Sequence, residues 1–570
     1  MNKDKNHQIF SGGQAVVEAL RIEGVKYVFG LIGSATMELF DALYETKDIK
    51  FIDVRDERTG AHMADGYARA SGQPGIVIAG QNGPGATNLV TGIAQANAAF
   101  SPVISLAGDI ASEHRGKDAF QEIDQQALFE PITKKTFSVK QTEKIPKILN
   151  EAFNLALTPR CGPVHVNLPR DILTNNANFA EFKKHQNNIL PKASKDNLTK
   201  TIDIILSSSK PVIIAGGGIK NAQGGQDVIH LAKILNIPIV SSAGHGDALP
   251  FDESLYAGQM GPRGNPIASD LVKEADVILA LGTRLGFNST FFSYENINEQ
   301  ASIIQVDIEP KSLGRYFPIT IGICADAKTV AIELYNEISL KKETIRINSW
   351  TKNFLDKRKA YLKKRDAEAD FNPHLIQPSG FFKILRETLP KNSAVTLDAG
   401  TLCLQATDML NFYHPRSLFT PLDFGLVGFS FACGLGVKLA KPDCPVISLM
   451  GDGGFGMTIS ELSTAVQHKI NTVTIVMNNK SWGAEKAYQR DFYEKRYIGA
   501  NIDSPPFDKV AELYGAAGFH VNKISELKDV INTALQCEKQ LSLMLKLTPA
   551  LFIVFERIHL NTNRNLNAVT

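Results

Sequence analysis

Two polar segments in the last third of the chain carry side chains that bind a hard cation. Asp452, in a Gly-Asp-Gly-Gly segment, follows the apolar run 445–450, and Asn479 follows the apolar run 472–477. Parallel strands bring the residues after them to one edge of a sheet, where open α/β sheets bind ligands. A carboxylate, an amide oxygen and a peptide carbonyl, which we assign to Ser481, suit Mg²⁺ and leave coordination positions for phosphate oxygens. The pattern predicts a magnesium site that also holds a diphosphate.

A Gly-Asp-Gly segment followed at this separation by paired asparagines resembles the thiamin diphosphate signature of the acetolactate synthase and pyruvate oxidase superfamily. The resemblance covers nearly the whole chain. It implies that magnesium, held by Asp452, Asn479 and Ser481, binds the diphosphate of thiamin diphosphate. It also implies a homodimer or homotetramer whose active site pairs the N-terminal domain of one chain with the C-terminal domain of another.

Glu57 is the expected catalytic residue, because it ends the predicted strand 51–54 and begins a helix in a segment that closely resembles the glutamate segment of this family. The resemblance implies that its carboxyl group hydrogen-bonds the pyrimidine ring and favours the imino tautomer that deprotonates the thiazolium carbon. Burial would raise its pKa and suit it to proton transfer. An isolated glutamate would otherwise be a surface or capping residue. Relatives usually carry His-Glu-Gln where this chain has Asp56-Glu57-Arg58, so the neighbouring polar groups differ.

Other segments resemble the cofactor loops of the family. The segment 81–88 follows the predicted strand 76–79 and is either a cradle for a ligand or a tight turn. The segment 398–402 resembles a loop whose backbone amides and hydroxyl bind the diphosphate, and 424–429 resembles the loop that wedges the cofactor into a bent shape. The expected cofactor-binding residues are Gly83, Pro84, Gly400, Thr401, Leu402, Gly425, Val427, Gly451, Asp452, Gly453, Gly454, Asn479, Ser481 and Trp482.

The substrate-pocket region separates the subfamilies. The segment 482–486, Trp-Gly-Ala-Glu-Lys, resembles sulfoacetaldehyde acetyltransferase, whereas the segments 86–92 and 118–124 resemble acetolactate synthase. We weigh the pocket segment more heavily and expect a small anionic carbonyl substrate, possible transfer to phosphate, and a two-carbon thiamin adduct. Gln121 is expected to contact the substrate carbonyl. Further candidates for substrate contacts, each equally a surface residue, are Arg284, Glu485, Lys486, Tyr488 and Arg490.

The alternative to an enzyme is a cofactor-binding relative without activity, which would serve as a regulatory or structural subunit. It would require the loss of Glu57 or of the paired metal ligands, and all of these are present. The sequence leaves open whether the central domain holds FAD, which we do not predict.

Length and composition favour a cytoplasmic protein of several domains. A chain of 570 residues is too long for a single core and suggests about three domains. Its 61 basic and 59 acidic residues give no electrostatic reason to expect nucleic acid or membrane binding. The first ten residues are polar, unlike a secretory signal. The six cysteines lack the spacing of metal ligands and are expected to be buried thiols.

Short β-rich runs alternate with helix-like segments in three stretches, which predicts three doubly wound, parallel-sheet α/β domains. We expect an N-terminal pyrimidine-binding domain at 8–174, a central domain at 196–340 and a C-terminal diphosphate and magnesium domain at 375–548. The polar stretch 175–196 and the charged, helix-prone stretch 341–372 are expected to connect them. A helix is expected at 457–468, after the metal segment.

Beyond residue 540 the chain stops resembling the family where a last strand is expected. When 541–560 is back-translated and read one base out of frame, the allowed codons permit Val-Ile-Asp-Val-Lys-Ala-Asp-Pro, which reads as a strand and a turn. We hypothesise a frameshift near Cys537–Leu541. Resequencing the gene tests it, because the codons of 552–559 must then also encode Tyr-Ser-Phe-Arg-Lys-Asp-Ser.

Overall fold

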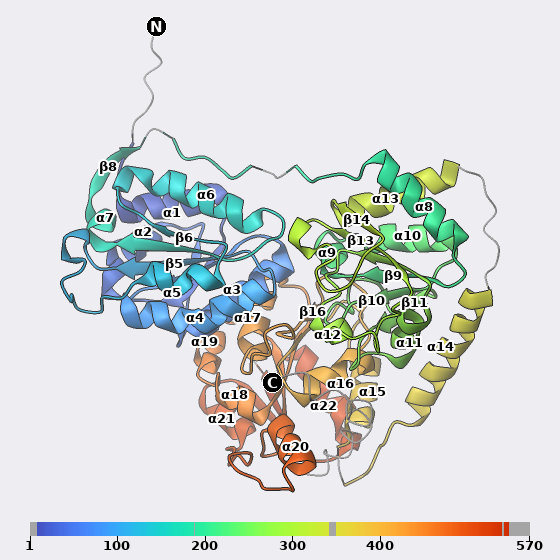
Figure 1. Ribbon diagram of the computed structural model, residues 1–570. Coiled ribbons are helices and arrows are strands. Elements are labelled where there is room, and N and C mark those ends of the chain that lie inside the picture. The colour runs from blue at the N-terminus through green and yellow to red at the C-terminus, as the bar shows by residue number, and fades with distance from the viewer. Residues whose placement is uncertain are drawn as a thin grey trace. The chain divides into compact units, whose positions relative to one another are not determined.

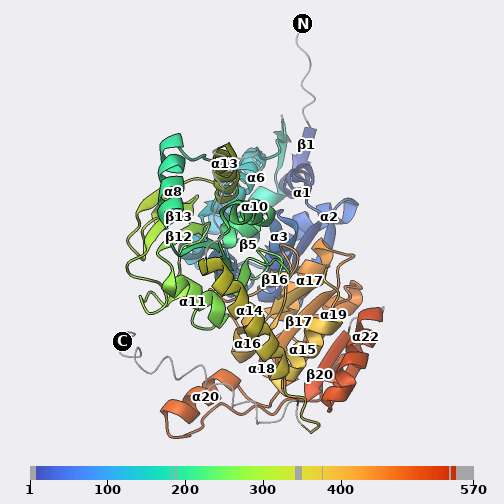
Figure 2. The same cartoon turned by 90° about the vertical axis from the view of Figure 1, so that its right-hand side faces the viewer.

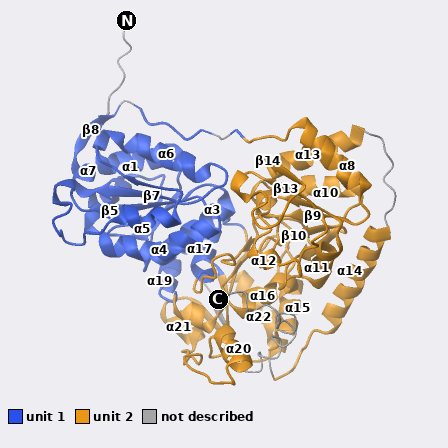
Figure 3. Ribbon diagram, viewed as in Figure 1, with its two compact units in different colours: residues 1–189, 429–443, 458–472 blue, residues 190–428, 444–457, 473–570 orange. Residues whose placement is uncertain are grey.

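The computed structural model describes residues 8–179, 181–186, 189–340, 349–374, 376–537 and 541–546. In these ranges the chain forms three six-stranded parallel sheets with helices against them (Figure 1), which confirms the expected fold class. The chain divides into two compact units (Figure 3): unit 1 contains 1–189, 429–443 and 458–472, and unit 2 contains 190–428, 444–457 and 473–570. No helix within the described ranges has the length and hydrophobicity needed to cross a bilayer.

The N-terminal sheet lies in unit 1 and has the strand order β3-β2-β4-β5-β7-β6. Its strands are β2 (Tyr27–Leu31), β3 (Lys50–Asp53), β4 (Gly75–Ala79), β5 (Val103–Asp109), β6 (Lys135–Ser138) and β7 (Val164–Pro169). Its helices are α1 (Gly12–Glu23), α2 (Met37–Glu45), α3 (Glu57–Ser71), α4 (Gly83–Ala98), α5 (Gln125–Phe129), α6 (Ile145–Leu157) and α7 (Arg170–Thr174). The strands β4, β5 and β7 are buried along their whole length, as expected for a sheet covered on both faces.

Two helices from the C-terminal part of the sequence also belong to unit 1, namely α17 (Ser430–Ala440) and α19 (Glu461–Gln467). Helix α17 packs closely on α3, because glycines stand where the two backbones meet. A Cβ atom at Gly66 would lie 2.3 Å from the carbonyl oxygen of Cys433, and one at Gly436 would lie 1.9 Å from that of Met63. This contact fixes α3, which begins at Glu57.

The central sheet lies in unit 2 and has the order β11-β10-β9-β12-β13-β14. Its strands are β9 (Pro211–Ala215), β10 (Ile239–Ser241), β11 (Tyr256–Gln259), β12 (Val277–Leu281), β13 (Ser302–Asp307) and β14 (Ile321–Cys324). The helices of this region are α8 (Lys195–Ser207), α9 (Gly217–Asn221), α10 (Gly225–Leu235), α11 (Pro266–Glu274), α12 (Phe287–Thr290), α13 (Ala327–Leu340) and α14 (Ser349–Ala367).

The C-terminal sheet, also in unit 2, has the order β16-β15-β17-β18-β20-β19 and is seen in Figure 2. Its strands are β15 (Ala394–Leu397), β16 (Leu418–Phe419), β17 (Val446–Gly451), β18 (Val473–Asn478), β19 (Ala517–Val521) and β20 (Leu541–Lys546). The helices in unit 2 from this part of the chain are α15 (Pro378–Thr388), α16 (Thr401–Met409), α18 (Asp452–Gly456), α20 (Gly483–Phe492), α21 (Phe507–Leu513) and α22 (Leu527–Gln536).

The structure corrects the helix expected at 457–468. Helix α18 begins at Asp452 and ends at Gly456, and α19 begins only at Glu461. Tight backbone hydrogen bonds between them, such as Glu461 to Thr458 and Leu462 to Ile459, form turns instead of a continuous helix. The physical reason lies in residues 458–460, because threonine, isoleucine and serine have lower helix propensity than unbranched side chains and so favour turns here.

Part of the stretch expected to be a connector is ordered. Within 175–196, strand β8 (Asn176–Phe179) pairs antiparallel with β1 (Gln8–Ser11). In the second connector α14 confirms the expected helical character, and residues 341–348 lie outside the described residues. The domain boundaries themselves stay predictions.

The strand expected near the end of the C-terminal sheet is formed by residues 541–546 of the present sequence, without a change of reading frame. Strand β20 pairs in parallel with β18 on one side and with β19 on the other. The frameshift stays a prediction, because the decisive residues 552–559 lie outside the described residues. The cysteines only partly match expectation: Cys403 and Cys433 are buried, whereas Cys324 is exposed.

Candidate active site

The C-terminal sheet has its topological switch point between β15 and β17. From β15 the chain first adds β16 on one side and later β17 on the other. The loops that leave the carboxyl ends of these two strands therefore diverge, which is where open α/β sheets bind ligands. These loops are 398–401 and 451–454, two of the segments that the sequence assigned to the cofactor.

Asp452 is the buried acidic group of this edge. Its side chain is 1% exposed, and Oδ2 accepts a hydrogen bond of 2.6 Å from the Ser504 hydroxyl. Burial raises the pKa of Asp452, while the Ser504 hydroxyl and the backbone amides of Asn479 and Gly453 oppose the rise. The Asn479 backbone amide is thus close to the carboxylate, so the structure brings residues 452 and 479 together.

Ser504 did not emerge from the sequence. A short antiparallel pairing brings its segment to the site: Ser481 pairs with Asn501, Trp482 N–H donates to the Ala500 carbonyl, and Ile502 N–H donates to the Lys480 carbonyl. The separation of 52 residues from Asp452 leaves no local pattern that could have revealed the contact.

Asn479, Ser481 and Trp482 form a compact turn after β18. The Asn479 Oδ1 atom accepts hydrogen bonds of 3.1 Å from both the amide and the hydroxyl of Ser481. The Trp482 ring lies over Gly453, where a Cβ atom would come within 2.5 Å of the ring. The tryptophan therefore requires glycine at 453. The segment 451–454, called the diphosphate loop below, packs against the Asn479 turn.

The residues of this edge fit a metal-bound diphosphate. The Thr401 hydroxyl is buried without a hydrogen-bond partner among the described residues, and Gly483 places the start of α20 close to it and to the Asn479 amide. Gly400, the residue before α16, has φ +100°, a conformation that favours glycine. Within the described ranges no three His, Cys, Asp or Glu side chains are grouped to hold a metal. A magnesium site would therefore use Asp452 with amide, carbonyl and phosphate oxygens.

The segment expected to wedge the cofactor lies beside this site. Val427 is half-buried, and Gly454 approaches it so closely that a Cβ atom there would lie 3.4 Å from Val427 Cγ1. The Asp398 carboxylate accepts a hydrogen bond of 3.0 Å from the Gly428 amide. Gly425 and Gly428 have φ values of +73° and +83°, so the segment bends at both glycines.

Glu57 lies in unit 1 as the first residue of α3, after the N-cap Asp56. Its side chain is 3% exposed, and Oε2 accepts a hydrogen bond of 2.9 Å from Asn88 Nδ2. Burial raises the pKa of Glu57, and the hydrogen bond from Asn88 partly opposes this. A buried carboxyl with a raised pKa is suited to hold and release a proton near neutral pH. The Cβ position of Gly85 lies 3.0 Å from Glu57 Oε1, so glycine there leaves space beside the carboxyl.

Gly83, Pro84 and Gln121 also lie in unit 1. Gly83 begins α4 with Pro84 next, and the Gly83 amide donates a hydrogen bond of 3.0 Å to the Gln121 carbonyl. Gln121 has φ +65°, an uncommon conformation for a residue with a side chain. The structure therefore brings the Gln121 backbone to the start of α4. The same helix contains Asn88, the hydrogen-bond partner of Glu57. The roles of these residues stay predictions.

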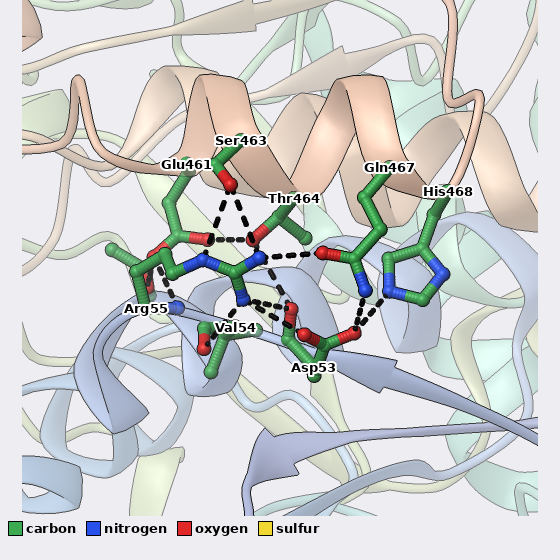
Figure 4. A network of polar contacts seen from close by, with 9 residues as sticks. Asp53, Val54, Arg55, Glu461, Ser463, Thr464, Gln467 and His468 are labelled. Carbon is green, nitrogen blue, oxygen red and sulfur yellow. Dashed lines mark hydrogen bonds and ion pairs between the residues drawn. The ribbon is translucent and has the colours of Figure 1, made fainter. Parts of the chain in front are cut away.

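A polar network supports the turn before Glu57 (Figure 4). The Arg55 amide and the Thr59 hydroxyl donate hydrogen bonds of 3.0 and 2.6 Å to Glu461 Oε1, and the Thr464 hydroxyl donates to its Oε2. The Arg55 guanidinium donates to Ser463, and Glu461 is fully buried. These contacts fix the residues on both sides of Glu57 against α19. Sequence reasoning missed the network because Arg55 and Glu461 are about 400 positions apart.

Asp53 completes this network on the strand side. It accepts hydrogen bonds from the Arg55 guanidinium, the Gln467 amide and His468 at 2.9, 2.9 and 2.5 Å. Burial acts to raise its pKa, but the hydrogen bonds from Arg55 and His468 prevail and lower it. Asp53 is therefore an anionic anchor for α19, unlike Glu57.

The candidate substrate residues fall into two groups. Glu485, Lys486, Tyr488 and Arg490 all lie on α20, which begins directly after the Asn479 turn. Lys486 Nζ donates a hydrogen bond of 2.7 Å to Asn501, and Arg490 pairs with Asp491 at 2.6 Å. Arg284 lies in the segment between β12 and α12, with its guanidinium 3.8 Å from the Asp423 carboxylate. The structure thus places four candidates on one helix and Arg284 on another segment.

Comparison with known proteins decides the family. The N-terminal TPP binding domain of the thiamine pyrophosphate enzymes matches residues 10–128, the central domain matches 198–334, and the C-terminal TPP binding domain matches 398–544. The chain belongs to the thiamine pyrophosphate enzyme family. Its fold and its thiamin diphosphate dependence follow from that membership, as the sequence predicted.

Relatives of this thiamine pyrophosphate enzyme carry two different names. A probable acetolactate synthase large subunit of Methanocaldococcus jannaschii is 34% identical over 95% of this chain and 92% of the relative. A sulfoacetaldehyde acetyltransferase of Alcaligenes xylosoxydans xylosoxydans is 32% identical over 92% of this chain and 90% of the relative. The acetolactate synthase isozyme 3 large subunit of Escherichia coli K12 is 33% identical, with 93% of each chain covered. Identity alone does not separate the two activities.

Proposed function

We propose that this enzyme is a sulfoacetaldehyde acetyltransferase. It would convert sulfoacetaldehyde and phosphate to acetyl phosphate and sulfite. In this reaction the aldehyde carbon loses its hydrogen as a proton, the carbon–sulfur bond breaks and sulfite leaves with its electron pair. The methylene carbon takes up a proton and becomes the methyl group, and a phosphate oxygen forms the new bond to the carbonyl carbon. Atoms, charge and electrons balance without an external oxidant or reductant.

Residues of unit 2 would bind the metal and the diphosphate, and residues of unit 1 would hold the proton and orient the substrate. Thiamin diphosphate, when bound, supplies a thiazolium carbon that can form a nucleophilic carbanion. Asp452, Asn479 and the Ser481 carbonyl would hold Mg²⁺ against the diphosphate, with the unpartnered Thr401 hydroxyl donating to a phosphate oxygen. The buried Glu57 carboxyl, with its raised pKa, would hold the proton that is exchanged with the cofactor's pyrimidine ring. Gln121 would orient the substrate carbonyl.

The placement of the segment 482–486 carries the choice of substrate. Its first residues pack on the diphosphate loop and beside Thr401, so the first turn of α20 starts at the proposed cofactor site. This turn contains Lys486, whose ammonium group suits a sulfonate or a phosphate. The same segment is the one that resembles sulfoacetaldehyde acetyltransferase in sequence.

Acetolactate synthase is the second candidate, because relatives of that name match equally well. That enzyme decarboxylates pyruvate and joins the two-carbon product to a second 2-oxo acid. Both candidates use anionic substrates, so Lys486 does not exclude it. We expect a homo-oligomer in either case.

Direct assay separates the candidates. The purified chain is loaded with thiamin diphosphate and Mg²⁺ and given sulfoacetaldehyde with phosphate, or pyruvate. We expect sulfite and acetyl phosphate in equal amounts from the first mixture and little acetolactate from the second. Acetolactate without sulfite would assign the acetolactate synthase reaction instead.

A further inference from the structure

The segment 417–428, which ends at the proposed cofactor wedge, is held at its start by a buried ion pair of the central domain. Lys220 of α9 and Asp247 are 4% and 1% exposed, and Lys220 Nζ lies 2.9 Å from Asp247 Oδ1. Lys220 Nζ also donates a hydrogen bond of 2.6 Å to the Leu418 carbonyl. Asp247 Oδ2 accepts from the amides of Ser417 and Leu418 at 2.9 and 3.0 Å. The pair therefore satisfies both backbone polar groups of Leu418, the first residue of β16.

The middle of the segment is held by other residues of the central domain. Asn288 Nδ2 donates to the Leu422 carbonyl at 3.3 Å and to Asp423 Oδ1 at 3.2 Å. The Arg284 guanidinium lies 3.8 Å from Asp423 Oδ2. Gly244, with φ +81°, lies under this part, where a Cβ atom would come within 3.2 Å of Leu422 Cδ2. Asp423 thus receives contacts from two residues of the segment 284–288.

The far end of the segment is held by the C-terminal domain, through the Gly428 amide and the Asp398 carboxylate. Beyond Asp423, Val427 lies against the segment 451–454, where a Cβ atom at Gly454 would be 3.4 Å from Val427 Cγ1. Only three residues separate Asp423 from Val427, so a residue that holds Asp423 is close along the chain to the proposed wedge.

We propose that Asn288 and Arg284 are positioning residues that act through Asp423 on Val427, and so make the affinity for the organic part of the cofactor depend on the central domain. The proposal rests on the proposed cofactor site and assigns Arg284 a role other than substrate binding. It predicts a selective effect: contacts to the thiazolium and pyrimidine rings weaken, whereas the diphosphate contacts of Thr401 and Asp452 do not.

The test compares two ligands in the same variants. Trp482 packs on the diphosphate loop, and the other tryptophan, Trp350, is buried in the central domain. In a Trp350→Phe background, the fluorescence of Trp482 reports ligand binding. Each protein is titrated in the presence of Mg²⁺ with thiamin diphosphate and, separately, with inorganic diphosphate. The variants are Asn288→Ala, Asp423→Ala and the double variant.

We expect each single variant to bind thiamin diphosphate about tenfold more weakly, corresponding to the loss of a hydrogen bond to a charged group, with inorganic diphosphate unaffected. The double variant is expected to be close to Asp423→Ala, because both changes remove the Asn288–Asp423 contact and the double variant loses in addition only the 3.3 Å hydrogen bond to the Leu422 carbonyl. Lys391→Ala is the matched control, since it breaks a 2.9 Å ion pair to Asp252 of the central domain without touching the segment 417–428. It should leave both affinities unchanged.

Equal weakening of both ligands, or none, would overturn the positioning role while leaving the proposed cofactor site intact. A parent protein that binds inorganic diphosphate but not thiamin diphosphate would overturn both. Trp350→Phe removes the hydrogen bond to the Pro211 carbonyl, and thermal melting of each variant shows that the comparison is made on folded protein.

Discussion

Glu57→Gln is expected to reduce turnover by about 10²- to 10⁴-fold, the usual contribution of a positioned acid–base group. The substituted amide has the same shape and can still accept the hydrogen bond from Asn88 with its oxygen. It cannot give up or take a proton. Cofactor binding should therefore change little, so the loss appears in kcat at saturating thiamin diphosphate.

The matched control is Glu23→Gln, which neutralises another buried carboxylate of unit 1 that pairs with His185. This variant should keep turnover within about threefold, because it lies outside the proposed machinery. Near-normal turnover in Glu57→Gln would refute the catalytic assignment.

The raised pKa of Glu57 also predicts the sign of a stability effect. A carboxyl group whose pKa is higher in the folded state contributes stability that is fully present below its unfolded pKa of 4.5 and is lost as the pH rises through the folded pKa. Because glutamine does not titrate, Glu57→Gln removes this decrease in stability with rising pH. The variant should therefore melt at the same or a higher temperature than the unaltered protein at neutral pH, and the difference should shrink toward pH 4.

Local patterns in the sequence were sufficient to predict the strands that carry the site. β17 and β18 are continuous apolar runs followed by glycine or asparagine, and both are fully buried within their sheet except at Gly451. The edge strands β6 and β14 were not predicted, because each has a single buried residue and reads as a loop. The edge strand β3 also has a single buried residue, but it was predicted because Phe51, Ile52 and Val54 form a more apolar run.

The residues that support the site could not be predicted, because their partners are distant in the chain. Glu461 contacts Arg55 and Thr59 over about 400 positions, and Asn288 contacts Asp423 over 135. Neither contact leaves a period or a motif. The resemblance to a family supplied Glu57 and Asp452, but only the folded chain reveals which groups hold their neighbours in place.

Asp452→Ala is expected to abolish magnesium-dependent binding of thiamin diphosphate. Asp452 is the only acidic side chain among the three proposed ligands, so its loss leaves two neutral oxygens, too few to hold Mg²⁺ beside a diphosphate. We expect affinity to fall by more than about 100-fold, since even groups around the ligands change metal affinity by about 10- to 100-fold. Isothermal titration calorimetry with thiamin diphosphate and Mg²⁺ measures this directly.

A graded series gives this prediction its specificity. Ser504→Ala keeps the carboxylate and removes only the 2.6 Å hydrogen bond to it, so it should weaken binding by about tenfold. Asp503→Ala removes the exposed neighbouring charge and should change nothing. The order Asp452→Ala, Ser504→Ala, Asp503→Ala should also appear in the Mg²⁺ concentration needed for half-maximal binding. If Asp452→Ala still bound thiamin diphosphate tightly, the cation would have to be held elsewhere, and the site at the ends of β17 and β18 would be wrong.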